Sequence, residues 1–303
     1  MPSIAWGGAK SMFDDAITHK LRDPAYLDLH FMAVASIRKV GALRWYDSNF
    51  LRRFEVAKHY LALVAPGSLD AFVGGFAPLL PRPDFAVTLL SDLFDAQTHA
   101  KIVEISRSVP READHKQQRN ELDQFGRHVI WDHPFFLELQ SDLVPRVSAI
   151  AGCELVPKYN FLSLYGGAGK CDPHMDEPMS MFTLDYCIEQ SEEWPIFFSR
   201  VVEWPSIDES RDIDLEALKA DPHLSFEPYC LKPNEALVFN GSSQWHYRNA
   251  IAPGGYCSLL FFHYFPKGCE NLVEPPQWSA HFDIPELGPL CDIFRQRGDL
   301  GLA

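Results

Sequence analysis

The sequence predicts a mainly β fold with flanking helices, an α+β arrangement built on an antiparallel sandwich or barrel. Before about residue 151, several segments have apolar residues every three or four positions, which is typical of amphipathic helices. From residue 156 onward, short aromatic and β-branched segments alternate in polarity between turn residues, which is typical of strands. Helices followed by a run of hairpin-linked strands favour a sheet structure with helices packed against it.

Three segments have the spacing of helices: 51–64, 91–106 and 134–151. Pro66 ends the first, and Ser91 or Asp95 would cap the second. Pro145 lies inside the third, where a missing N–H would kink or split it. Residues 107–121 are polar and aperiodic, so we expect a solvated loop or a lid there.

Six segments are expected as strands: 159–165, 181–188, 196–202, 236–239, 244–251 and 256–265. The run Pro253-Gly254-Gly255 predicts a turn between the last two. Residues 207–228 form an acidic insertion, which we expect to be partly helical. We therefore predict a helical N-terminal region over 1–83, packed on a catalytic domain over 84–303. The β core would span about 156–266, with the Pro-rich tail from Pro266 wrapped around it.

Composition excludes several classes of function. The 303 residues carry 27 Lys and Arg against 41 Asp and Glu, a net charge of −14, which disfavours nucleic acid and anionic membranes as partners. No apolar run approaches the roughly 18 residues of a membrane span, and the N-terminus does not resemble a signal peptide. Seven cysteines without a CxxC pair predict reduced thiols, mostly core filler, in a cytoplasmic protein. Oligomeric state is not predicted.

His174-Met175-Asp176 is the first candidate metal motif. At strand spacing, both ligands point to one face, and imidazole with carboxylate suits iron(II) when a third ligand completes the set. Two His-x-Asp matches occur, about as many as chance supplies, so the motif alone is weak. The other, His281-Phe282-Asp283, has no later histidine. His128 and His133, five positions apart, do not form a ligand pair on a strand or loop.

The surrounding sequence strengthens the first match. Tyr165 is followed by Gly166-Gly167-Ala168-Gly169, whose glycines permit a tight reversal into the motif. His246 follows His174 by 72 residues, on a segment expected as another strand. A histidine there could supply the third ligand.

Over about 100 residues, the chain resembles the Fe(II)/2-oxoglutarate-dependent dioxygenases, in particular the prolyl-hydroxylase-like branch. The residues that carry the resemblance are, in order, Tyr165-x8-His174-x-Asp176, Phe182-Thr183-Leu184-Asp185-Tyr186, Pro233-x2-Ala236-Leu237-Val238-Phe239 and His246. The resemblance implies a double-stranded β-helix (jelly-roll, cupin-like) core. It also implies that His174, Asp176 and His246 bind iron, and that the Tyr165 hydroxyl contacts 2-oxoglutarate.

One position departs from the family pattern. Where the family commonly has Arg or Lys for the distal carboxylate of 2-oxoglutarate, this chain has Tyr256, although Ser258 matches. A buried dicarboxylate still needs a cation. Arg248, two residues after His246, is the first substitute, and Arg200 is the second. Tyr165, Arg248, Tyr256 and Ser258 are thus the candidate co-substrate residues.

The resemblance implies an oxygenase with iron(II), 2-oxoglutarate and O2, which hydroxylates an amino acid, peptide or biosynthetic small molecule and releases succinate and CO2. Residues 107–121 and 207–228 would flank the barrel mouth. Asp185 would orient substrate or make a structural hydrogen bond, and Trp131, Trp245 and Tyr247 would be core or pocket residues. Two alternatives stay open: a non-oxygenase cupin-like metalloenzyme, which the missing cation favours, and a catalytically silent barrel that serves as a binding module.

Overall fold

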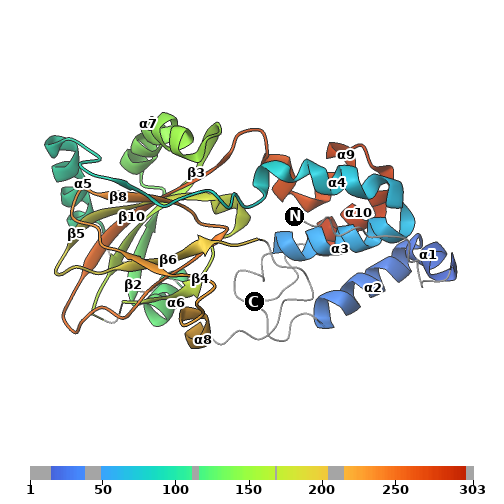
Figure 1. The fold of residues 1–303 in the computed structure, drawn as a ribbon, viewed down its shortest axis with the longest axis horizontal. Helices are drawn as coiled ribbons and strands as arrows, with labels where there is room; N and C mark the ends of the chain where they lie inside the picture. Colours follow the sequence, from blue (N-terminus) through green and yellow to red (C-terminus); the bar gives the residue numbers. More distant parts are fainter. Residues whose placement is uncertain (1–14, 38–48, 111–115, 168, 204–214, 298–303) are drawn as a thin grey trace. The chain divides into compact units, whose positions relative to one another are not determined.

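The computed structural model divides the chain into two units (Figure 1). It describes residues 15–37, 49–110, 116–167, 169–203 and 215–297. The sheet unit comprises the described residues between 79 and 270, and the helical unit comprises 15–37, 49–78 and 271–297.

The helices of the helical unit are α1 (Asp15–Leu21), α2 (Pro24–Ile37), α3 (Asn49–Val64), α4 (Leu69–Gly75), α9 (Trp278–His281) and α10 (Gly288–Arg297), with short 3-10 turns between them. The sheet unit contains β1 (Thr88–Leu90), α5 (Ala96–Ser108), α6 (Lys116–Phe125), β2 (Arg127–Trp131), α7 (Pro134–Ala151), β3 (Leu155–Tyr165), β4 (Cys171–His174), β5 (Phe182–Gln190), β6 (Ile196–Val201), α8 (Leu215–Lys219), β7 (Glu227–Tyr229), β8 (Ala236–Asn240), β9 (Gln244–Arg248) and β10 (Cys257–Pro266).

The strands form two antiparallel sheets. The larger has the order β1-β8-β5-β10-β3-β2, and the smaller has the order β4-β9-β6-β7. From β3 to β10, successive strands alternate between the sheets, apart from the β6–β7 pair, which stays within the smaller one. Two sheets wound in this way make a double-stranded β-helix, so the predicted fold class is confirmed.

The inner faces of the sheets meet in one apolar core. Strand pairing places Cys257 opposite Tyr165 and Leu259 opposite Ser163, so alternate residues of β3 and β10 point inward together. The interior contains a cluster of buried residues from both sheets and the segments next to them: Tyr165, Cys187, Trp194, Ile196, Phe198, Leu231, Leu237, Phe239, Ile251, Cys257 and Leu259. Three of them, Tyr165, Ile196 and Phe239, also line a cavity.

The three predicted helices are present as α3, α5 and α7. Asp95 is the N-cap of α5, because its carboxylate accepts the Thr98 N–H at 2.8 Å. Pro145 does not split α7, contrary to expectation. The buried stripe of α7 includes Leu143 and Val147 on either side of the proline, so packing against β3 holds the helix together.

Part of the predicted loop 107–121 is helical. Helix α5 runs to Ser108 and α6 begins at Lys116, while residues 111–115 lie outside the described residues. The Gln118 amide of α6 hydrogen-bonds both backbone groups of Val129, which ties the helix to β2. Within the insertion 207–228, the described residues include α8 and the start of β7, and 207–214 lie outside them.

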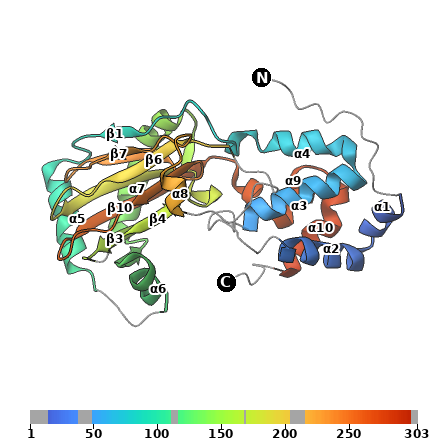
Figure 2. The same ribbon diagram turned by 60° about the horizontal axis from the view of Figure 1, so that its bottom comes forward.

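The helical unit combines helices from both ends of the chain, with α9 and α10 beside α3 and α4 (Figure 2), and aromatic residues pack between them. The fully buried Trp278 of α9 packs against Phe50, Phe72 and Phe76, with ring centroids 5.4–6.1 Å apart. The segment from 271 therefore belongs with the N-terminal helices, whereas the sequence placed it on the catalytic domain. Its apolar side chains are buried against α3 and α4, which explains the difference.

All seven cysteines are free thiols, and three of them, Cys187, Cys257 and Cys291, are buried. Among the described helices, none combines the length and the apolar character that crossing a bilayer requires.

Candidate metal centre and its cavity

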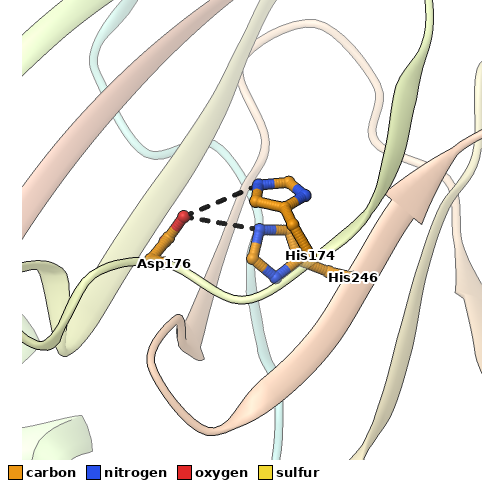
Figure 3. A group of neighbouring side chains, drawn as sticks. All are labelled: His174, Asp176 and His246. Atoms are coloured by element: carbon orange, nitrogen blue, oxygen red, sulfur yellow. Dashed lines mark ion pairs between the residues drawn. The ribbon is translucent and has the colours of Figure 1, made fainter. Parts of the chain in front are cut away.

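Strand pairing brings together three residues that the sequence proposed as metal ligands (Figure 3). His174 is the last residue of β4 and lies directly opposite His246 of β9. Asp176 follows two residues later, and its N–H donates to the Gly241 carbonyl at 2.8 Å, in the turn that precedes β9. The motif and the distant histidine thus share one edge of the smaller sheet.

The ligand atoms point toward one another. The Asp176 Oδ1 atom lies 3.7 Å from His174 Nε2 and 3.6 Å from His246 Nε2, and all three atoms lie within 4.8 Å. Among the described residues, these three form the one group of His, Cys, Asp or Glu side chains that could hold a metal ion.

The histidine tautomers suit a metal. His174 Nδ1 lies 2.9 Å from the Asp172 carbonyl, and His246 Nδ1 lies 3.0 Å from the Gln244 carbonyl. Because a carbonyl only accepts, both Nδ1 atoms carry a proton, and the Nε2 atom of each ring faces Asp176. This is the backbone-supported orientation that metal-binding imidazoles commonly have.

Asp176 is held from two sides. The Thr183 hydroxyl of β5 donates to Asp176 Oδ2 at 2.9 Å. A Cβ atom at Gly241 would overlap the same oxygen, so only glycine leaves room for this carboxylate. With Oδ2 engaged, Oδ1 faces the two imidazoles. Two imidazoles and one carboxylate that leave other positions open are a donor set that fits iron(II).

The charges around this group favour a cation. Burial lowers the pKa of His174, but Cys171, whose Sγ lies 3.6 Å from His174 Nδ1, and Asp176 raise it to about 9. Burial raises the pKa of Asp176, yet the neighbouring imidazoles, His246 first, hold it below its ordinary range. Burial lowers the pKa of His246. A divalent ion would replace the proton on His174.

The ligands line a cavity of about 310 Å³ inside the sheet unit. One wall is aromatic and follows the strand register: Trp131 of β2 pairs with Phe161 of β3, which pairs with Phe261 of β10. The Trp131 ring lies 4.8 Å from the Phe161 ring and is 40% exposed, so it contacts solvent as well as the wall. Tyr159 adds a further ring, 5.7 Å from Trp131.

Two arginines line the same cavity, and each already has a carboxylate partner. Arg248 Nη2 lies 2.7 Å from Asp185 Oδ2, and Arg248 Nη1 donates to the Trp194 carbonyl. Arg127 Nε lies 2.7 Å from Glu121 Oε2, and Arg127 Nη1 donates to the Tyr165 hydroxyl at 2.8 Å. Burial opposes the charge on both guanidiniums, but these partners raise the pKa of each above its ordinary value.

The structure separates the predicted co-substrate residues into two groups. Tyr165 and Arg248 line the metal cavity. Tyr256 and Ser258 line a different pocket, with Arg107 and Glu189, on the outward-facing positions of the larger sheet. Arg200 is exposed and lines neither pocket. Of the aromatic residues that the sequence proposed for a pocket, Trp131 and Tyr247 line the metal cavity and Trp245 does not.

Several cavity residues were given no role from the sequence, among them Arg127, Thr183 and His263. Arg127, Val129 and Trp131 are two positions apart, so a strand over these residues would have placed Arg127 on the same face as Trp131, beside the cavity wall. That five-residue strand sits between two helices, where propensity gives little signal. His263 could be found only through the register of β10, which has a bulge next to it.

No protein-family model matches this chain, and no curated protein is significantly similar to it. The chain is similar in structure to HygX from Streptomyces hygroscopicus, solved with nickel and 2-oxoglutarate bound (TM-score 0.46, 10% identity, 60% of this chain and 83% of HygX covered). It is also similar to EctD from S. alaskensis with bound Fe (TM-score 0.43, 13% identity, 64% of this chain and 75% of EctD covered). A third similar structure is the non-heme alpha ketoglutarate dependent carbocyclase SnoK from nogalamycin biosynthesis (TM-score 0.43, 10% identity, 61% of this chain and 83% of SnoK covered).

Proposed function

We propose that this protein is an Fe(II)- and 2-oxoglutarate-dependent oxygenase. It would hydroxylate an amino acid, a peptide or a biosynthetic small molecule and release succinate and CO2. The observation that carries the proposal is the meeting of His174, Asp176 and His246, with their metal-binding atoms convergent, in a cavity large enough for organic ligands. The seven free thiols support a reducing compartment such as the cytoplasm.

The two histidines and Asp176 would hold the iron. When bound, iron(II) with 2-oxoglutarate activates dioxygen to oxidise a C–H bond of the substrate. The protein's contribution is positional. The Asp172 and Gln244 carbonyls fix the two imidazole rings, and the aromatic wall offers an apolar surface beside the metal ligands.

For the distal carboxylate of 2-oxoglutarate, Arg127 with the Tyr165 hydroxyl is a better candidate than Arg248. Moving Arg248 to a ligand would strip Asp185, which is 0% exposed, of its ion-pair partner, and an unpaired buried charge is costly. Glu121, the partner of Arg127, is 16% exposed and can turn to solvent at lower cost. We therefore assign the carboxylate subsite to Arg127 and Tyr165, and a structural role to Arg248.

The aromatic wall supports a substrate with an apolar face. Trp131, Phe161 and Phe261 offer stacked and tilted rings in the cavity that the metal ligands also line. A ring or an extended aliphatic group could pack on them, with the C–H bond to be oxidised directed at the metal.

One observation favours a second candidate function, a non-oxygenase cupin-like metalloenzyme that uses zinc or manganese. Among the described residues that line the cavity, both arginines are already neutralised by carboxylates, and no lysine is present. A cavity without an available cation would suit an uncharged substrate better than a dicarboxylate.

Anaerobic spectroscopy separates the two candidates. Iron(II) and then 2-oxoglutarate are added to the purified protein, and the visible metal-to-ligand charge-transfer band is recorded, with the His174→Ala variant as the control. The oxygenase proposal expects a band in the wild type and none in the variant. Bound iron without a band would overturn the co-substrate assignment and favour the other metalloenzyme. If no metal binds at all, both candidates fail.

A further inference from the structure

Thr183, which donates to Asp176, has a second polar neighbour, His263, that has no part in the chemistry described so far. Thr183 of β5 and His263 of β10 lie directly opposite each other in the larger sheet and both face the cavity. Thr183 Oγ1 lies 2.9 Å from Asp176 Oδ2 and 3.0 Å from His263 Nδ1. The three side chains therefore form a continuous chain of hydrogen bonds.

The direction of these bonds follows from proton counting. The Thr183 hydroxyl has one proton, and an ionised Asp176 can only accept, so that proton lies on the bond to Asp176. Thr183 must then accept from His263, which requires the proton of His263 on Nδ1. The chain thus runs from His263 through Thr183 to Asp176 Oδ2.

The surroundings of His263 support this single arrangement. The ring is 3% exposed and lies against Tyr159 and Phe161, with centroids 4.3 and 5.5 Å away. Burial lowers the pKa of His263 to about 4, so the ring is neutral and carries one N–H at ordinary pH. His263 Nε2 has no hydrogen-bond partner among the described residues, so the bond from Nδ1 to Thr183 is the hydrogen bond that orients this ring.

We propose that Thr183 and His263 are positioning residues, which make Asp176 a metal ligand through one oxygen only. Because His263 donates to the Thr183 oxygen, the Thr183 hydroxyl donates its own hydrogen bond to Asp176 Oδ2. The other carboxylate oxygen, Oδ1, is left to face both histidines. A carboxylate with both oxygens unengaged can rotate or bind a metal through both, which removes an open coordination position. The inference rests on the metal site of the proposed function, but not on the oxygenase reaction.

The first test compares Thr183→Val with Thr183→Ser. Valine keeps the shape of threonine without the hydroxyl, and serine keeps the hydroxyl. Anaerobic calorimetry with Fe(II), and with Co(II) as a spectroscopic substitute, measures metal affinity without any turnover. We expect Thr183→Val to lose about 10–100-fold in affinity, with a changed Co(II) visible spectrum, and Thr183→Ser to stay within a few-fold of wild type.

The second test acts on the far end of the hydrogen-bond chain and leaves Thr183 in place. His263→Asn can still offer an N–H near the position of Nδ1, whereas His263→Leu cannot. We expect the leucine variant alone to weaken metal binding, and the Thr183→Val/His263→Leu double variant to be no weaker than Thr183→Val. Such non-additivity is the signature of residues that act in series.

The outcomes distinguish this inference from the proposed function. If the wild type binds metal and Thr183→Val binds it equally well, the inference is overturned and the metal site stands. Equal losses in Thr183→Val and Thr183→Ser would also overturn it, because packing and not the hydroxyl would then matter. If Thr183→Val fails to fold by circular dichroism, the His263 pair decides alone. A wild type that binds no metal would overturn the proposed function with it.

Discussion

The two ends of the cavity treat their polar groups in opposite ways. At the metal end, three ligand atoms converge while their remaining hydrogen-bonding positions are taken by backbone carbonyls and Thr183. At the other end, Arg127 and Arg248 each have a carboxylate partner from the protein itself. The metal end is thus arranged to receive a ligand, and the arginine end can receive one only by exchanging a partner.

This difference between the two ends determines which charged ligand each of them can bind. A divalent cation at the metal end would displace at most a proton, from His174. An anion at the arginine end must compete with Glu121 or Asp185. Because Asp185 is fully buried and Glu121 is not, the cost of exchange is much lower at Arg127. Three predictions test this contrast.

The largest effect is expected at the buried pair. Arg248→Met leaves Asp185 buried without a cation, so we expect the free energy of unfolding to fall by about 3–5 kcal/mol. Urea denaturation measures the loss. The Arg248→Met/Asp185→Leu double variant, which removes both charges, should recover most of it. A single variant as stable as the wild type would show that Arg248 is free to serve a ligand.

The next effect concerns the metal end and its pH dependence. His263 binds its proton only below about pH 4 in the folded protein, but near pH 6.5 when unfolded. Its contribution to stability is therefore complete above pH 6.5 and is lost as pH falls toward 4, by about 3 kcal/mol. Unfolding of wild type and His263→Phe across this window should show a smaller acid loss in the variant.

A histidine elsewhere supplies the control for that experiment. His223 is exposed, so His223→Ala should keep the acid loss of the wild type. Parallel pH profiles for the wild type and His263→Phe would contradict a neutral His263 and would weaken the bond direction inferred for Thr183.

The smallest effect is expected at the exchangeable pair. Glu121→Gln removes the charge that competes for Arg127, so 2-oxoglutarate should bind several-fold more tightly, as titration of the iron-loaded protein under anaerobic conditions would report. Glu189→Gln is the matched control, since Glu189 pairs with Arg107 outside the metal cavity. Weaker binding in Glu121→Gln would move the carboxylate subsite away from Arg127.

The same contrast explains how far the sequence could be interpreted. The metal ligands could be predicted from the sequence, because two lie in one short motif and the third lies on a strand that β-helix topology pairs with that motif. The main strands and the helices α3, α5 and α7 could also be predicted, because the apolar residues of each recur with a clear period.

The ion pairs at the arginine end could not be predicted from the sequence, because the two partners of a pair come from distant elements. Asp185 and Arg248 are 63 residues apart, and nothing in their local sequence joins them. Arg127 depended on a five-residue strand, and α6 is too polar to show a helical stripe, so its first residues were taken as loop. The sequence analysis placed the tail on the catalytic domain, because the aromatic residues of the tail indicate burial without indicating which element they pack against.

The interleaving of the two units in the chain has a consequence for biosynthesis. Helices α1–α4 emerge from the ribosome first, but Trp278 and Phe294, which complete their core, are translated only after the entire sheet unit. The sheet unit, whose described residues lie between 79 and 270, can collapse while the early helices still expose Phe50, Phe54, Phe72 and Phe76. We expect that window to be when nascent chains depend most on chaperones.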